Sequence, residues 1–272
     1  TVPEEQPIVS HPRTLIIAED GSRATCVETC CGHGDQACLV NPVTEIVAGD
    51  DVHVDHYRIV REGKGTWHIG GFGLTQGNDS NVNSCCMAME GALIRNGMTG
   101  TLDGTDGMAN LRGLAIVEGE RHVDNFLRVN HMKPDCNSRE YFKHILTDHG
   151  TTAFTGRIYV ELDAQKTDAV QTNMNLVLSE TAKVRTRPQL EIFADDVKCT
   201  HGATIGRLDE QAAFYLHARG IGKEAARSLL TFAFANEVIE DIEFIPLRKK
   251  MEALILERLP HGELLRSMGD LD

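Results

Sequence analysis

Short apolar runs, many of them rich in β-branched residues, recur from Arg13 to about Gly206 and are separated by Gly, Asp and Asn. Runs of this length bounded by such residues are typical of β-strands. Examples of runs predicted as strands are Leu15–Ala18, Val43–Val47, Val52–Val60, Leu111–Val117, Phe126–Asn130, Phe154–Val160, Asn175–Leu178 and Leu190–Phe193. So many strands in close succession predict an all-β body.

Turn-forming residues stand between these runs. Each turn segment supplies a Gly, Asp or Asn, which tolerates the positive φ that tight turns need. The predicted turns include Glu19–Gly21, Ala48–Asp51, Glu118–Glu120 and Asp148–Gly150.

The pattern changes at Leu208, and from Asp209 apolar residues recur at helical spacing. Asp209 is a suitable N-cap and Gly220 a suitable stop for a first helix. A second helix is predicted from Lys223 to about Asp241, and a third from Pro246 to Leu259.

Three prolines, Pro3, Pro7 and Pro12, fall in the opening segment, where each fixes φ and removes a backbone donor. We therefore expect an extended linker at residues 1–12, a β domain at 13–207 and a helical domain at 208–272. Strand spacing alone leaves open whether the β domain is a sandwich, a barrel or a solenoid.

The chain has 272 residues and a formal net charge of -13, which disfavours nucleic acid as a partner because phosphates require a basic face. No apolar run approaches the roughly 20 residues needed to span a bilayer, and the N-terminus does not resemble an export signal. The cytoplasm is therefore the expected location.

The chain contains eight cysteines. Disulfide frameworks belong mainly to small secreted domains, so reduced thiols are expected here. The chain begins at Thr1 rather than at Met, which favours a processed protein or a piece cut from a longer one.

Motifs for nucleotide and ester chemistry are missing from the sequence. The segment Gly220–Glu224 has Glu where a phosphate-binding loop needs Ser or Thr, and it lacks the upstream Gly. Gly70–Gly73 does not continue as a dinucleotide fingerprint, and no Gly-x-Ser-x-Gly elbow occurs. None of these segments therefore supports nucleotide or ester chemistry.

The densest group of soft ligands lies between Cys26 and Cys38. Its residue types suit zinc or an iron-sulfur cluster, but its spacing contains no Cys-x-x-Cys pair. Adjacent thiols in an extended chain also point to opposite faces. A loop with incidental thiols is the favoured interpretation, over a dedicated metal site, for Cys26, Cys30, Cys31, His33 and Cys38.

Cys199 and His201 lie two residues apart, which places both on one face of an extended strand. Two ligands cannot complete a tetrahedral iron or zinc site, so a cluster here would need donors from another strand or another chain. The alternative is a Cys and a His that fill ordinary positions at the end of a strand.

Several segments of the chain together match the pattern of one known family. They are Arg187–Glu210, Phe214–Leu216, Arg219–Ile221, Asp163–Ala169 with Gln171, Phe154–Ile158, His131 and Ser138–Glu140. Through these segments the sequence resembles the SufD branch of the SufB/SufD iron-sulfur cluster assembly scaffold family. The resemblance extends from about Pro7 to the third predicted helix, and it is most specific in the second half.

This resemblance implies a right-handed parallel β-helix followed by a small C-terminal helical domain. It also implies a scaffold subunit of the Suf complex, in which a SufB-like subunit pairs with the β-helix and a SufC-like ATPase binds the helical domain. The chain itself would then be non-enzymatic, and ATP hydrolysis would belong to the partner. The implied location is the cytoplasm, or the plastid stroma in a plant.

His201, with Cys199 as the weaker candidate, is expected to bind a transient iron-sulfur cluster shared with the partner, and no cofactor is expected in the isolated chain. The partner-binding candidates are Phe232, Phe234 and Phe244. Gly202 after His201 favours the SufD branch, because SufB-like chains have Glu there. The family's N-terminal helical domain has no counterpart here, so we expect a truncated chain.

Two other classes remain as alternatives: a β-helix carbohydrate-active enzyme, and a stand-alone metal-binding protein that uses the loop from Cys26 to Cys38. In isolation the chain is expected to form a homodimer through the strands that flank Cys199 and His201, since an open strand edge has unpaired backbone groups that can pair with another chain.

Overall fold

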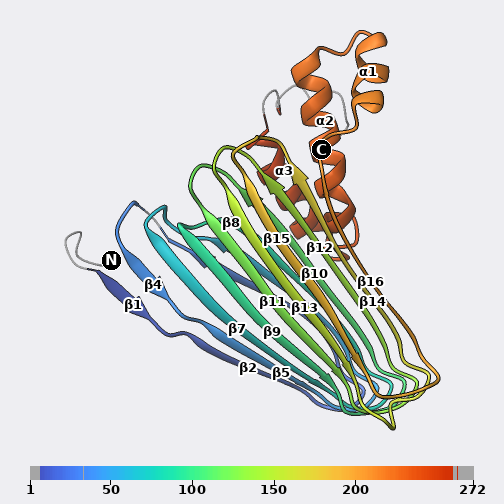
Figure 1. The fold of residues 1–272 in the computed structure, drawn as a ribbon. Helices are drawn as coiled ribbons and strands as arrows, with labels where there is room; N and C mark the ends of the chain where they lie inside the picture. Colours follow the sequence, from blue (N-terminus) through green and yellow to red (C-terminus); the bar gives the residue numbers. More distant parts are fainter. Residues whose placement is uncertain (1–6, 33, 260–261, 263–272) are drawn as a thin grey trace.

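The computed structural model, which describes residues 7–32, 34–259 and 262, is a parallel β-helix followed by three helices (Figure 1). The strands form two parallel sheets, and the chain passes from one sheet to the other at each turn. This arrangement confirms the β-helix and excludes the sandwich and the barrel that strand spacing alone left open.

The first sheet contains β1 (Ile8–Ser10), β2 (Arg13–Ala18), β4 (Cys38–Val40), β5 (Val43–Ala48), β7 (Thr66–Gln76), β9 (Leu93–Leu102), β11 (His122–His131), β13 (Thr151–Val160) and β15 (Lys183–Ile192). The second contains β3 (Arg23–Cys31), β6 (His53–Arg61), β8 (Asn81–Glu90), β10 (Met108–Val117), β12 (Asn137–Leu146), β14 (Asp168–Val177) and β16 (Lys198–Gly206).

Each coil of the β-helix stacks on the previous one with little change of register. Asn81 pairs with Met108, 27 residues later, and Asn137 pairs with Asp168, 31 residues later. Because paired residues in a parallel sheet point to the same face, each inward position stacks on the inward position of the next coil.

The turns between sheets use residues that tolerate a positive φ. Asp51, Asp79, Asp106 and Asp135 occupy successive turns with φ between 52° and 60°. Asp favours this conformation more than most non-glycine residues because its short side chain bonds locally. The turns predicted at Gly21, Asp51, Gly119 and Asp148 are confirmed.

Most of the strands are longer than the apolar runs that predicted them. In β14 the prediction found only the end from Asn175, whereas the strand begins at Asp168 and buries Gln171 and Asn173. These polar residues face the interior, where they form hydrogen bonds. The first half of the strand therefore has no apolar run by which the sequence could predict it.

The predicted N-terminal linker also differs, because Ile8–Ser10 pairs with Cys38–Val40 as part of the first sheet. Residues 1–6 of that linker lie outside the described residues.

The predicted helices are confirmed as α1 (Glu210–Ala218), α2 (Lys223–Ile239) and α3 (Ile245–Leu256). Asp209 caps α1 by accepting hydrogen bonds from the backbone N–H groups of Gln211 and Ala212, at 2.8 and 3.3 Å. Gly220, with φ +88°, follows its end. No helix in the described part of the chain is long and apolar enough to cross a membrane.

Helices α2 and α3 cover the outer face of the second sheet, while α1 extends away from it (Figure 1). Lys143 on β12 is fully buried beneath α2, and its Nζ donates to the Phe234 carbonyl at 2.9 Å and pairs with Glu237 at 2.7 Å. The sheet and the helices share one apolar core, which includes Met87, Leu114, Ile145, Val238, Ile242, Met251 and Ile255. The helical segment is therefore packed on the β-helix. Its predicted end, residues 260–272, lies outside the described residues apart from Gly262.

Inside the β-helix, the ring of Phe142 lies over Gly113 of the neighbouring coil. A Cβ atom at Gly113 would lie 2.4 Å from the Phe142 ring, and Phe142 is completely buried. We expect Gly113→Ala to lower the free energy of unfolding by about 1–3 kcal/mol, since the ring has no space to move into. Urea unfolding measures this loss. Gly97→Ala is the control, because its Cβ would meet only an ordinary contact at 3.7 Å. Equal effects of the two substitutions would contradict the packing argument.

Candidate functional site

Within the described residues, the last coil leaves two strand edges open at the C-terminal end of the β-helix, β15 in the first sheet and β16 in the second. Strand β16 pairs with β14 on one side and is the last strand of its sheet among the described residues. Its residues are mostly exposed, whereas in β14 every second residue from Ala169 to Asn175 is buried. The side chains and backbone of β16 are therefore accessible at the end of the β-helix.

Cys199 and His201 both point toward the interior from this open strand. In register they pair with Ala169 and Gln171, both of which are buried. Cys199 is half-buried and His201 is exposed, because no further coil covers them. The two side chains thus share one face. No third Cys, His or carboxylate joins them in a metal-binding group within the described residues.

Burial raises the pKa of the Cys199 thiol, and the nearby Asp168 carboxylate also raises it, against a hydrogen bond involving the Ala169 backbone. The thiol is therefore protonated at neutral pH. To bind a metal, Cys199 must first release this proton.

A buried polar column continues from His201 into the β-helix. Gln171 lies next in register, and its Nε2 donates to the carboxyl group of Glu140 on β12. Burial raises the pKa of Glu140 to about 8, although the Gln171 hydrogen bond lowers it. Oε1 of Glu140 and Oε1 of Gln171 have no hydrogen-bond partner within the described part of the chain. The open edge therefore connects to a polar interior.

The three phenylalanines predicted to bind a partner lie in different surroundings. Phe232 and Phe234 are partly buried and pack against the core between helices and sheet, and Lys143 Nζ lies 4.1 Å from the centre of the Phe234 ring. Phe244 is 45% exposed. Most of the Phe232 and Phe234 surface is thus used within the chain.

The more exposed aromatic side chains are on α1, where sequence reasoning did not place a partner surface. Phe214 is 72% exposed and Tyr215 is 54% exposed, and α1 buries none of its residues. Beside Phe214 lies a cavity of about 570 Å³ between α1 and the end of the second sheet, lined by Val177, Leu178, Leu208, Phe214 and Ala226, among others. The sequence signal was the adjacent aromatic pair in a helix too short to bury it.

At the opposite end of the β-helix, the cysteine-rich segment forms strand β3 and the start of β4 rather than a loop. Cys26 and Cys30 are partly buried, whereas Cys31, next to Cys30, is exposed. The expectation that adjacent thiols point to opposite faces is therefore confirmed here. His33 lies outside the described residues.

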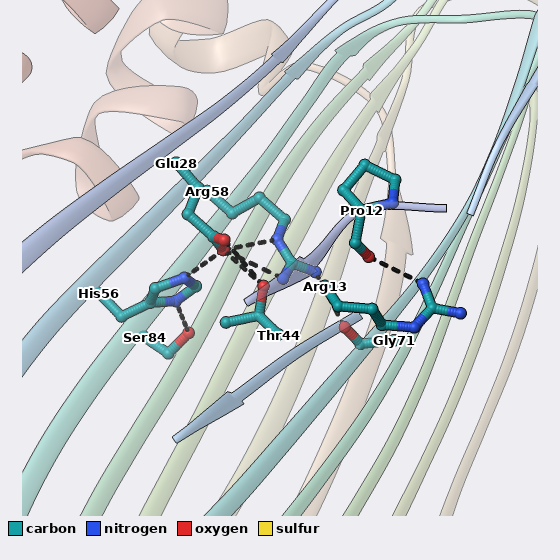
Figure 2. Close-up of polar contacts among 8 residues, drawn as sticks. All are labelled: Pro12, Arg13, Glu28, Thr44, His56, Arg58, Gly71 and Ser84. Carbon is teal, nitrogen blue, oxygen red and sulfur yellow. Dashed lines mark hydrogen bonds and ion pairs between the residues drawn. The ribbon is translucent and has the colours of Figure 1, made fainter. Parts of the chain in front are cut away.

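Glu28 is the centre of a hydrogen-bond network at this end. Figure 2 shows its carboxylate beside His56, Arg58 and Thr44. The carboxylate accepts from Thr44 Oγ1 at 2.8 Å and from Arg58 Nη2 at 3.1 Å, and His56 Nε2 lies 2.8 Å away. Burial alone would raise the pKa of Glu28, but the His56 hydrogen bond, the Arg58 charge and the Thr44 hydrogen bond outweigh it and lower the pKa to about 2.

The sequence matches, over residues 2–234, a family described as the SufBD core domain of the SUF system for FeS cluster assembly. It is 33% identical to the iron-sulfur cluster assembly protein SufD of Escherichia coli (strain K12), over 95% of this chain and 61% of that protein. A SufBD family iron-sulfur cluster assembly protein of Synechocystis is 31% identical, over 94% of this chain and 58% of that protein.

The chloroplastic protein ABCI7 of Arabidopsis thaliana is 32% identical, over 85% of this chain and 49% of that protein. The chain thus spans about half to three-fifths of the length of these relatives.

Glu140 makes stability depend on pH. Its pKa in the folded chain, about 8, is above its ordinary value of 4.5, so folding retains a proton that the unfolded chain has released. The contribution of this group to the free energy of unfolding is fully present below about pH 4.5, and it is lost as the pH rises to about 8. Glu140→Gln keeps an acceptor for Gln171 but has no proton to lose. We expect the free energy of unfolding of this variant, relative to that of the original chain, to rise by at least about 2 kcal/mol from pH 5 to pH 8.

Urea unfolding at the two pH values measures this gain. Glu120→Gln, on an exposed turn, is the control and should show none. A Glu140→Gln chain whose stability keeps the original pH dependence would show that the carboxyl group is ionised when folded.

Proposed function

Because the chain belongs to the SufBD core family of the SUF iron-sulfur cluster assembly system, we propose that it is a non-enzymatic scaffold subunit of the SufD type. In this proposal the β-helix, residues 13–207, pairs with a SufB-like subunit, and the helical segment from residue 208 binds a SufC-like ATPase. The nascent cluster is the cargo of the complex, and ATP hydrolysis belongs to the partner.

The observation that carries the proposal is the open edge of β16 with Cys199 and His201 on its inward face. A strand edge with unpaired backbone groups is a ready template for another strand. Apolar side chains are exposed at the same end, where Phe193 is 55% and Ile205 is 56% exposed. Joining a partner here would cover these side chains and bring further ligands to Cys199 and His201.

His201 is the stronger of the two cluster-binding candidates. Its side chain is exposed at the edge, and a neutral imidazole binds iron without leaving a fixed charge to be desolvated. Cys199 is more buried and holds its proton at neutral pH, so it can also serve simply as an apolar thiol. Two ligands from one strand leave the remaining positions to a partner chain.

For the ATPase we propose α1 as the docking element, in place of the packed Phe232 and Phe234. Phe214 and Tyr215 offer exposed aromatic surface beside an apolar cavity, which is the kind of site where interface energy concentrates. Phe244 lies at the start of α3 and forms a second, smaller exposed site.

Without a SufB-like chain, the same edge can pair with its equivalent in a second copy, which gives a two-fold dimer. The proposal therefore includes a homodimer of the isolated chain that a SufB-like partner displaces. Sedimentation of the chain alone and with the partner separates these assemblies.

His201→Ala should leave the chain folded and able to pair, because the removed ring is exposed. We expect the rate of cluster formation by the complete complex to fall at least about tenfold, since a ligand is lost. The measurement is cluster absorbance during anaerobic assembly. Thr200→Ala, on the exposed outer face of the same strand, is the matched control. Normal assembly by a folded His201→Ala complex would refute the assignment.

Replacing Phe214 and Tyr215 together by Ser should weaken ATPase binding at least about tenfold, because exposed aromatics are replaced at the centre of the proposed contact. Stability should change little, since both side chains are more than half exposed. Calorimetric titration with the ATPase measures the affinity. Leu162→Ser, at a 59% exposed position in the turn between β13 and β14, is the control. Unchanged affinity would move the docking site away from α1.

A further inference from the structure

Three potential metal ligands converge at the N-terminal end of the β-helix, opposite the end that carries His201. They are Cys30 on β3, Glu62 just after β6 and His68 on β7. The sulfur, a carboxylate oxygen and a ring nitrogen all lie within 4.8 Å of one another. These residues come from three separate segments, so their convergence is a product of the coil geometry.

Glu62 and His68 are deeply buried, at 5% and 0% exposure. His68 Nδ1 lies 3.2 Å from Glu62 Oε1, and Nε2 has no hydrogen-bond partner within the described residues. Nε2 lies against Gly70, where a Cβ atom would be only 2.9 Å away. Nδ1, which faces the Glu62 carboxylate, is therefore the nitrogen placed to bind a metal beside that carboxylate.

The neighbouring charges favour a cation. Arg58 is the nearby positive group, and it is already neutralised, because its Nε and Nη2 donate to Glu28 at 3.3 and 3.1 Å (Figure 2). Its Nη1 is directed to the Gly71 carbonyl at 3.3 Å. Within the described residues, the His68 ring is the only ion-pair partner of the Glu62 carboxylate.

The group is also accessible. A cavity of about 1250 Å³ at this end is lined by Glu28, Cys30, Arg58, Glu62 and Thr66, among other residues. Cys30 is only partly buried, so an ion entering the cavity meets its sulfur before it reaches the deeper His68.

We propose that Cys30, Glu62 and His68 form a binding site for a divalent transition-metal ion, with Zn²⁺ as the best match. A thiolate, an imidazole and a carboxylate are zinc ligands, whereas Mg²⁺ and Ca²⁺ require mainly oxygen. In a tetrahedral zinc site the ligand atoms lie about 3.5 Å apart, and His68 Nδ1 and Glu62 Oε1 are already this close, at 3.2 Å. The fourth position faces the cavity and is open to water or to a further donor.

This site is independent of the scaffold function proposed for His201, and the experiment separates the two. The substitutions Cys199→Ser and His201→Ala remove the candidate ligands at the opposite end of the β-helix. The chain that carries both is titrated with Co²⁺, a spectroscopic substitute for Zn²⁺, under anaerobic reducing conditions. We expect one Co²⁺ per chain and a thiolate-to-cobalt charge-transfer band, which Zn²⁺ removes by displacement.

Cys30→Ser in this background should abolish the charge-transfer band and weaken Co²⁺ binding at least about tenfold. Cys31→Ser is the matched control, because Cys31 is adjacent in sequence but exposed on the opposite face, and it should keep the band. Glu62→Gln should keep the band and also weaken binding, because the amide retains the shape but is a poor ligand. Circular dichroism confirms that each variant is folded, and Glu62→Gln decides the question if Cys30→Ser does not fold.

Three results would overturn the site: no charge-transfer band in the background chain, a band that persists after Cys30→Ser, or equal losses from Cys30→Ser and Cys31→Ser. Unchanged Co²⁺ affinity in Glu62→Gln would overturn it as well. None of these results bears on cluster assembly at His201.

Discussion

The structure depends on one constraint, the continuous parallel pairing that keeps each coil in register with the next. Since paired residues face the same way, an inward polar side chain must find its partner in an adjacent coil or across the interior. Asn96 donates to Asn125 at 2.9 Å, and Asn125 Nδ2 lies 2.9 Å from His144 Nε2. His144 Nδ1 then contacts Asn175 Oδ1 at 2.8 Å. The interior is therefore a set of hydrogen-bonded polar stacks between apolar layers.

The same constraint determines what happens at the two ends. Within the described residues, pairing stops at β16 on one side and at the first coil on the other, so interior polar groups become accessible there. At the C-terminal end these groups are Cys199 and His201, above Gln171 and Glu140. At the N-terminal end they are Glu28, Cys30 and Arg58. The C-terminal site is thus the exposed continuation of a buried column, whereas the N-terminal site is a buried group that opens into a cavity beside Cys30.

The three helices have different roles: α2 and α3 pack on the second sheet, and α1 is exposed. α2 and α3 complete the core of the second sheet, with Lys143 joining the sheet to Phe234 and Glu237. α1 contributes no buried residue and exposes Phe214 and Tyr215. Consequently Phe232 and Phe234 on α2 are largely used for packing within the chain. Phe214 and Tyr215 on α1 are available to a partner.

The sequence by itself determined the change from strands to helices at Leu208, the cap at Asp209, the turns and the shared face of Cys199 and His201. These features depend on neighbours along the chain, where local backbone preferences and strand alternation apply. Choosing a β-helix over a sandwich or barrel needed the resemblance to a family, because coils of 26 to 32 residues carry no repeated motif. Only the tertiary structure decided the polar half of β14, the role of Phe234 and the meeting of Cys30, Glu62 and His68. Each of these depends on contacts between coils or between helix and sheet, and such contacts leave no local pattern in the sequence.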